Sequence, residues 1–571
     1  MKKRFVFTLL ILVALFVVGC AGAPAEEAAP EEEAAPAEEA APEEEAAPEE
    51  AEEPAEEAAE PAEGKIQLRL AHSWPARVDP AIGGDFIALT MHTNIYDTLV
   101  FPTVDGGLEP WVAESWEVSD DSLIYTFHLQ EGIKFHDGSE LQASDVVFSY
   151  DRLQTVGQGM AYMFEGRVES VEALDDYTVE FTLTEPYALF EQSLLRLYIT
   201  NEEEVMAHVE EEGEYGEYGD YATDWMLTHS AASGPYKVKE VQLEEFVLLE
   251  KNEDWWAADM FVENSPDEVR FIPLPEAATL KTLMANQELE ISDQWQSADT
   301  FRSVAEIEGV EIAAFDAVTV LHIYMNTARA PLDDVHCRRA VAYAFDYETA
   351  AAIDWEGTPQ SRAPVPIHAA GANTELTPYT YDLDKAREEL AQCKYADDIE
   401  NYPIEFNWVT EVPDEEKYAL LTQSGLAQIG MPVEVIGTPW LTCTELATQP
   451  ETSPMLWPVY LNVELPEAGS MLDQRYHSNT TGTFFQGEWL RDDYFDERLE
   501  EAFVTLDRDE RFEIYRELQE HIMDLSPTIF AFDQLQKHAY QTYVDWPAAE
   551  GVVYPVMGYN QFFAVMGVNP H

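Results

Sequence analysis

The nucleophilic and acid–base residues of this chain do not have the spacing of a known catalytic motif. The chain has no G-x-S-x-G elbow, no phosphate loop, no H-E-x-x-H helix and no G-x-G-x-x-G turn. His136 and Asp137 could act as a base and its orienting carboxylate, but Asp137-Gly138 is typical of a hairpin turn. With 111 acidic residues, pairs of carboxylates occur by chance and indicate no glycosidase. We therefore predict no catalytic residue, no metal ligand and no cofactor.

Cys20 lies where a thiol is modified after export. Lys2, Lys3 and Arg4 precede an apolar run, Phe5 to Val18, that is too short for a comfortable membrane span. Small residues then lead into Cys20, a pattern that resembles a bacterial lipoprotein signal, with Cys20 lipidated and first in the mature chain. An ordinary secretory signal is the alternative. Acyl chains at roughly 0.8 kcal/mol per buried CH₂ would anchor the protein to the outer face of the cell membrane.

Residues 21–64 contain only Ala, Glu, Pro and Gly. Proline recurs every six residues from Pro24 to Pro48, which leaves Glu/Ala runs too short to form a helix. The 18 glutamates of this segment have no basic residue among them and repel one another. We predict a disordered tether that reaches from roughly 40 Å to about 130 Å. It either lets a binding domain search near the membrane or is a simple spacer.

The charge of the chain excludes one class of partner. The net charge is −80; the first 20 residues carry +3 and residues 21–64 carry −18, which leaves −65 on residues 65–571. Phosphate backbones bind basic surfaces, so we predict no nucleic-acid partner. An acidic surface also repels anionic lipid headgroups, which agrees with a domain held away from the membrane by a tether.

The elements that would position a site alternate between strands and helices. About 500 residues follow the tether, which is more than one hydrophobic core holds. Strands at 404–408 and 433–436 flank a helix at 418–429, an order typical of α/β lobes. Near the N-terminal side, alternating apolar residues predict strands at 123–129 and 133–135, and Ser144 is the predicted N-cap of the next helix.

Two blocks of residues carry a family resemblance. The first consists of Tyr96 to Val100, Pro110, Ala113 to Trp116, Tyr125 to Phe127, Gly132 to Gly138, Ala143, Asp145 to Val147, Ser149 and Arg152. The second consists of Pro331 to Val335 and Arg338 to Asp346. With these residues in this order, the chain resembles the family 5 extracellular solute-binding proteins, the receptors of peptide- and nickel-type ABC importers.

The resemblance implies an α/β, two-lobed periplasmic-binding-protein fold (type II, cluster C-like) with an extra small domain inserted in the first lobe. We expect lobe I to hold residues 65–92, 227–318 and 527–571. The extra domain then spans residues 93–226, and lobe II spans residues 319–526.

The function implied is that of a membrane-anchored, extracytoplasmic substrate-binding protein. It would capture an oligopeptide or a similar small solute by lobe closure, with crossovers near residues 318–326 and 524–532 absorbing the rotation. It would then deliver the solute to the permease subunits of an ABC importer, and we expect a monomer. Two alternatives stay open, the same receptor role for an oligosaccharide and a tethered extracytoplasmic hydrolase.

Five tryptophans are candidate ligand contacts. In the resemblance, the segment with Trp74 borders the ligand cleft and Trp295 ends a strand that opens onto it. Trp408, Trp440 and Trp457 lie at predicted strand ends of lobe II. Each can equally be a packing residue.

The recognition of a peptide amine is in question at one segment. In peptide-binding members, an Asp in a W-x-x-D-Y-x-D-P-like segment accepts the peptide's amino group. Residues 457–466 depart from this pattern, and Asn462 stands where the Asp would be. Because Asn carries no charge, the ion pair is lost unless Glu464 replaces it.

Three cysteines lie outside the signal region: Cys337, Cys393 and Cys443. An extracytoplasmic location permits a disulfide. Cys337 and Cys393 lie on two predicted helices of one lobe, so we favour that pair and leave Cys443 free. No cysteine has the spacing of a metal ligand.

Overall fold

The structure is a computed structural model that describes residues 64–72, 77–273 and 275–571. The predictions for Cys20, for the tether of residues 21–63 and for Trp74 lie outside the described residues. The chain divides into two units, residues 1–60 and 61–571, and the description below concerns the second unit.

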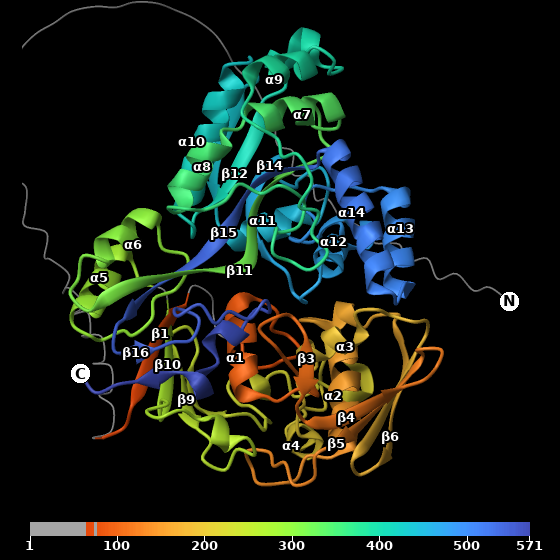
Figure 1. The fold of residues 1–571 in the computed structure, drawn as a ribbon, viewed down its shortest axis with the longest axis vertical. Coiled ribbons are helices and arrows are strands. Elements are labelled where there is room, and N and C mark those ends of the chain that lie inside the picture. The colour runs from red at the N-terminus through yellow and green to blue at the C-terminus, as the bar shows by residue number, and fades with distance from the viewer. Residues whose placement is uncertain (1–63, 73–76, 274) are drawn as a thin grey trace, which may run out of the picture. The chain divides into compact units, whose positions relative to one another are not determined.

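Lobe I is built on a four-stranded sheet with the order β1-β10-β9-β8 (Figure 1). Its strands are β1 (Gln67–His72), β8 (Tyr236–Gln242), β9 (Phe246–Lys251) and β10 (Glu268–Pro273), with helices α1 (Phe86–Ile95), α5 (Ala277–Ala285) and α6 (Ala298–Val304). Strands β1 and β10 are parallel, whereas β10-β9 and β9-β8 are antiparallel. Leu68 and Leu70 alternate with less buried neighbours and fill the core, as the period of two predicts.

The inserted segment forms its own antiparallel sheet, ordered β4-β5-β7-β6. Its elements are β2 (Val100–Pro102), β3 (Leu108–Pro110), β4 (Ala113–Val118), β5 (Ile124–Leu129), α2 (Ala143–Val156), β6 (Val168–Asp175), β7 (Thr178–Leu183), α3 (Phe190–Ser193), η2 (Leu194–Arg196) and α4 (Glu202–Ala207). On β5, Tyr125, Phe127 and Leu129 are buried and the residues between them are not. The predicted strand at 123–129 is confirmed.

Two local predictions in this segment are wrong. Residues 133–135 form no strand. Lys134 makes only an isolated bridge to Glu140, because the chain turns back between these two residues. The N-cap of α2 is Gln142 and not Ser144. Asp145 is the reason, since its carboxylate accepts the Gln142 N–H (2.8 Å) and closes a capping box two residues earlier.

Lobe II is built on a five-stranded sheet with the order β13-β12-β14-β11-β15. Its strands are β11 (Val310–Met325), β12 (Ile404–Val409), β13 (Val433–Thr438), β14 (Leu456–Asn462) and β15 (Thr528–Gln541). Its helices are α7 (Val335–Ala344), α8 (Tyr347–Asp354), α9 (Leu383–Leu390), α10 (Asp414–Ala427), α11 (Trp440–Ala447), α12 (Ala468–Tyr476), α13 (Asp493–Val504) and α14 (Arg508–Leu525). After β15, the chain returns to lobe I and ends with the short strands β16 (Val544–Asp545) and β17 (Gly567–Val568).

Strands β11 and β15 connect the lobes. They pair antiparallel from Val310↔Gln541 to Tyr324↔Thr528, and Figure 1 shows them running together between the two sheets. Their register slips between Asp316 and Thr319, where β11 has two extra residues. One of them, Val318, has a φ of +52°, which is uncommon for a β-branched residue. A second, smaller shift lies between Leu321 and His322, so the pair of crossovers has two irregular points, both where the sequence predicts a crossover.

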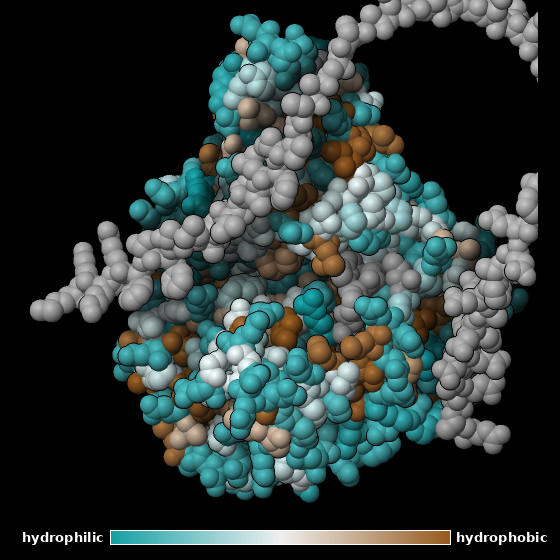
Figure 2. All heavy atoms as spheres, turned by 180° about the vertical axis from the view of Figure 1, so that it is seen from behind, coloured by the Kyte–Doolittle hydropathy of each residue, from teal (hydrophilic) through white to brown (hydrophobic). Residues whose placement is uncertain are grey.

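The surface of the described unit agrees with the acidic composition. The face shown in Figure 2 is largely hydrophilic, with hydrophobic residues in small separate groups. Among the described residues, no helix is long and apolar enough to cross a membrane.

A disulfide joins helix α7 to the segment just after α9, so Cys393 lies beyond the end of the helix on which the sequence predicts it. The Sγ atoms of Cys337 and Cys393 are bonded, with a Cα–Cα distance of 5.2 Å. Both residues lie in the core of lobe II, and Cys443 is buried as a free thiol.

We expect Cys337 and Cys393 to resist alkylation in the unfolded protein until a reductant is added, whereas Cys443 reacts without it. Peptide mass spectrometry after iodoacetamide treatment distinguishes the three. The bridge closes a loop of 56 residues, so its reduction should lower the free energy of unfolding by about 4 kcal/mol in the chain-entropy model. Alkylated Cys337 and Cys393 in the unreduced sample would contradict the pairing.

Candidate functional site

The loop after Ile291 brings lobe I side chains to lobe II. Ile291 bridges Leu70 on one side and Tyr540 on the other, so the chain leaves the sheet here at its edge. Asp293 folds the loop, because its carboxylate accepts the N–H of Trp295 at 2.7 Å and the side-chain amide of Gln296 at 3.0 Å. Trp295 follows this loop outside the strands and is half-buried.

Trp295 meets a lobe II aromatic residue. Its ring lies edge-on to Tyr460 of β14, with 5.3 Å between the ring centroids. A second aromatic contact bridges the lobes where Tyr162 of the extra domain lies 6.2 Å from Phe485. The Tyr162 hydroxyl also accepts a hydrogen bond from the Gln474 side chain at 3.3 Å. The surface between the lobes is thus aromatic on both sides.

The other candidate tryptophans differ in their burial. Trp440 is half-buried and contacts Phe484, with centroids 5.3 Å apart. Trp457 lies beneath it and is 1% exposed, packed between Trp440 and Tyr324, so it belongs to the lobe core. Trp408 packs on the backbone of Gly437 at the edge of the lobe II core. The structure therefore places Trp295 and Trp440 beside interlobe contacts and not Trp408 or Trp457.

Asn462 is tied to the crossover strand. Its Nδ2 donates to the Thr319 hydroxyl at 2.8 Å, and Thr319 is the first paired residue after the register slip. The next residue, Val463, donates its N–H to the Val318 carbonyl at 3.3 Å. The segment that carries both Asn462 and Glu464 is thus fastened to the irregular point of β11.

Glu464 faces a guanidinium of the opposite lobe. Its Oε2 lies 3.7 Å from Nη2 of Arg196, and both side chains are almost fully buried. The same Nη2 donates to the Glu464 backbone carbonyl at 3.1 Å, and Nη1 donates to the Met557 carbonyl at 3.0 Å. Burial raises the pKa of Glu464 to about 7, although the charge of Arg196 acts in the opposite direction. A carboxyl between the lobes therefore titrates near neutral pH.

Several residues of this surface were not predicted from the sequence. They are Tyr162, Arg196, Asp293, Tyr460, Phe484 and Phe485. Burial raises the pKa of Asp293 to about 6, and its position two residues before Trp295 is a usable signal. Arg196 also had a signal, since it is the single charge in the apolar run Leu194 to Tyr198.

No arrangement among the described residues supports catalysis or metal binding. The Nε2 of His136 contacts the Gly234 carbonyl at 3.0 Å, and burial lowers the pKa of this imidazole to about 4. Asp137 accepts hydrogen bonds from Ser139, which is its role in the turn. The one group of possible metal ligands in the described part of the chain includes both disulfide sulfurs.

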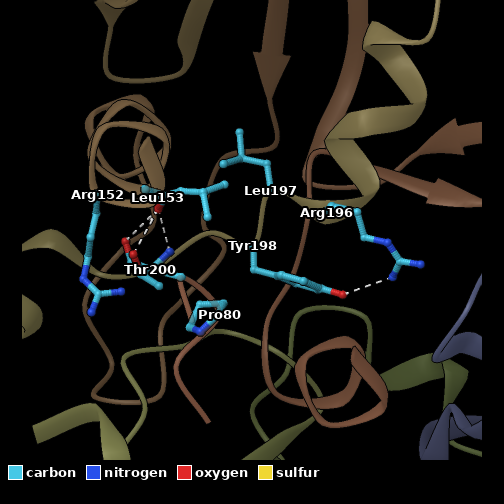
Figure 3. A pocket seen from close by; sticks show the side chains of 9 residues that line it. Pro80, Arg152, Leu153, Arg196, Leu197, Tyr198 and Thr200 are labelled. Carbon is cyan, nitrogen blue, oxygen red and sulfur yellow. Dashed lines mark hydrogen bonds between the residues drawn. The ribbon is translucent and has the colours of Figure 1, made fainter. Parts of the chain in front are cut away.

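A small internal cavity lies beneath the first family block (Figure 3). Its volume of about 10 Å³ is close to that of one water, so it is too small for a solute. On one side of it, Arg152 makes a bidentate ion pair with Asp79, with both N–O distances at 2.7 Å. Both residues are at most 3% exposed, so this pair fixes the loop after β1 against α2.

Comparison with known proteins agrees with the fold. The model of the family described as bacterial extracellular solute-binding proteins, family 5 (middle), matches residues 107–483. A probable D,D-dipeptide-binding periplasmic protein of Escherichia coli K12 is 25% identical over 474 residues, which are 81% of this chain and 87% of that protein. The heme-binding protein A of Haemophilus influenzae is 25% identical over 501 residues, 83% of this chain and 86% of that protein.

Solved structures show the same fold with different ligands. The DppA protein of Helicobacter pylori in complex with the peptide STSA has a TM-score of 0.75 at 23% identity, covering 89% of this chain and 99% of that one. NikZ of Campylobacter jejuni in complex with Ni(L-His) has a TM-score of 0.74 at 18% identity, covering 88% and 99%.

We expect Glu464 to make the stability of the protein fall as pH rises. The folded-state pKa of about 7 lies above the ordinary value near 4.5, so the native state favours the protonated carboxyl. The contribution of Glu464 to the free energy of unfolding is complete at low pH. It is lost between about pH 4.5 and pH 7 and is on the order of 3 kcal/mol in all. The neutral variant Glu464→Gln should flatten this part of the profile.

Thermal unfolding between pH 4.5 and pH 8 measures the effect, with the exposed Glu172→Gln as the control for a lost surface charge. The parent and Glu172→Gln should lose stability in parallel, and Glu464→Gln should lose less. Three parallel profiles would remove Glu464 as the titrating group.

Proposed function

Because the chain belongs to the bacterial extracellular solute-binding proteins of family 5, we propose that it captures a peptide or a similar small solute and delivers it to the permease of an ABC importer. Membership in this family makes it a binding protein and not an enzyme. The observation that carries the mechanism is the pair of crossover strands, β11 and β15, as the link between two α/β lobes. A ligand that contacts both lobes binds best when they are closed and so shifts the population toward that state.

The site we propose lies between the lobes, at Trp295 and Trp440, with Trp74 as a further candidate. Aromatic faces on both sides of the surface, at Trp295 and Tyr460, suit a ligand with apolar side chains or sugar rings. Trp408 and Trp457 then support the site through packing.

The recognition of a peptide amine takes a different form here. The Asn462 side-chain amide donates to the Thr319 hydroxyl, and the Glu464 carboxyl lies next to the Arg196 guanidinium. We propose that Glu464 supplies negative charge near the ligand only as part of this pair. An oligopeptide is the ligand class that the relatives' names favour, since they include a D,D-dipeptide-binding and a dipeptide-binding protein. An oligosaccharide is the second candidate, on the strength of the aromatic surface.

We propose that a lipidated Cys20 anchors the protein to the outer face of the cell membrane and that residues 21–64 act as its tether. We propose that the protein acts as a monomer, since one chain holds both lobes. The lipid is testable by intact-mass analysis of the membrane fraction, in which Cys20→Ser should release the protein.

Mass balance separates the receptor from a tethered hydrolase. Native mass spectrometry of the purified protein should show a small molecule bound at one copy per chain. Incubation with peptides or oligosaccharides that raise the melting temperature should return them unchanged. Products of cleavage would overturn the receptor function.

We expect Trp295→Ala to weaken binding of such a solute at least tenfold, because a half-buried aromatic face between the lobes is lost. The melting temperature of the empty protein should change little, since Trp295 lies outside its own sheet. Isothermal titration calorimetry with the copurified solute measures the change.

Trp225→Ala is a matched control, because Trp225 is also half-buried but stacks between His208 and His229 within the extra domain. This variant should bind as the parent does. Equal affinity of Trp295→Ala and the parent would remove Trp295 from the site.

A further inference from the structure

Arg167 crosses the boundary between the lobes. It directly precedes strand β6 in the extra domain of lobe I and follows Gly166, whose φ of +71° turns the chain. Its two terminal nitrogens reach Glu500 of α13 in lobe II, at 2.9 Å from Nη1 to Oε2 and 3.2 Å from Nη2 to Oε1. This bidentate geometry is the strongest form of the arginine–carboxylate pair.

Aromatic rings enclose the same guanidinium. It lies 4.8 Å from the centroid of Tyr187 in lobe I and 5.0 Å from that of Phe503 in lobe II. Next to them, the Ala188 N–H donates to the Phe503 carbonyl at 2.8 Å, a backbone hydrogen bond between the lobes. The Arg167 side chain is therefore only 14% exposed, and the pair is shielded from solvent on the arginine side.

Further charged groups surround the pair. On lobe II, His477 Nε2 lies 3.4 Å from Glu500 Oε1, and its Nδ1 lies 4.0 Å from Asp496. On lobe I, Glu185 lies 3.7 Å from Arg167. Asp473 of α12 adds a half-buried carboxyl whose charge acts on both Arg167 and His477. The hydrogen bond from His477 and the charge of Arg167 lower the pKa of Glu500, so this carboxylate is ionised at neutral pH.

We propose that Arg167 and Glu500 form an electrostatic clasp that holds the two lobes together without a ligand. The contact lies on α13, away from the crossover strands, where a small rotation about β11 and β15 produces a large displacement (Figure 1). Breaking the clasp leaves a cation and an anion to be solvated separately and separates Tyr187 from Phe503. The clasp therefore sets how much of the empty protein is closed.

This clasp affects the affinity for any solute. The apparent dissociation constant equals the intrinsic one divided by the fraction of protein in the binding-competent state. A clasp that closes the empty protein too well would instead slow ligand entry. The strength of one ion pair thus tunes the receptor without any contact to its ligand.

The test measures the distance between the lobes in the full chain without added solute. Spin labels are placed at Leu243→Cys in lobe I and Leu420→Cys in lobe II, which are 57% and 49% exposed. Cys20→Ser gives a protein without the proposed lipid anchor and without a thiol at that position, whereas Cys443 is buried and the remaining two cysteines are bonded. Double electron–electron resonance then measures the distances between the two labels, and from them the populations of closed and open protein.

We expect Arg167→Gln and Glu500→Gln to raise the ratio of open to closed protein roughly three- to tenfold. Arg498→Gln and Glu517→Gln are the matched controls, because they remove the same charges from a pair 2.9 Å long within lobe II. The controls should give the distances of the parent. The double variant Arg167→Glu with Glu500→Arg should restore part of the closed population.

Arg167→Lys keeps the positive charge but cannot form the bidentate pair. It tests the clasp also in the case that Arg167→Gln folds poorly. It should open the protein to a smaller degree. Parent-like distances in Arg167→Lys, Arg167→Gln and Glu500→Gln would overturn the clasp, as would an empty parent that shows no closed population. Equal opening by the controls would also overturn it and would point to the total charge of the protein.

Discussion

The pairing of β11 with β15 is the constraint on which the rest of this structure depends. One hydrophobic cluster contains residues of both lobes, and the ladder from Val310↔Gln541 to Tyr324↔Thr528 also belongs to both. A rotation of one lobe against the other must bend or twist this ladder. The easiest place is the slip between Asp316 and Thr319, because β-bulges bend strands and increase their twist. The segment with Asn462 and Glu464 is hydrogen-bonded to this point, so the hinge and the surface between the lobes form one unit.

Local patterns predicted most of the elements but not the direction in which the strand-end residues point. The strand at 123–129 has one buried face, so its period of two is visible in the sequence. Strand β14 lies between β12 and β11 and is buried on both faces, which removes the period. For this reason, the sequence left open whether Trp457 contacts a ligand or packs in the core, and the structure buries it. The N-cap of α2 was misplaced for a smaller reason, since Asp145 selects Gln142 over the better N-cap former Ser144.

The partners of the site residues are set by contacts between distant parts of the chain. Arg196 and Glu464 are 268 residues apart and meet only because η2 packs against the end of β14. No periodicity or motif encodes such a pair. The fold also does not determine the ligand, since similar structures hold a peptide in one case and Ni(L-His) in another. The ligand must therefore be selected by side chains that differ between proteins of this fold.

The strong acidity of the protein gives the few interlobe cations a particular role. With −65 on residues 65–571, two acidic bodies repel each other as they close, and salt weakens this repulsion beyond about 10 Å. The contacts between the described lobes place a cation of one against a carboxylate of the other, at Arg167–Glu500, Arg196–Glu464 and Lys417–Asp299. The last pair is exposed and contributes little, whereas the first two are shielded and lose less to salt. Salt therefore acts on closure in two opposite ways, and the net sign depends on burial. We infer that the two shielded arginine pairs favour closure, whereas the general repulsion of the acidic lobes opposes it.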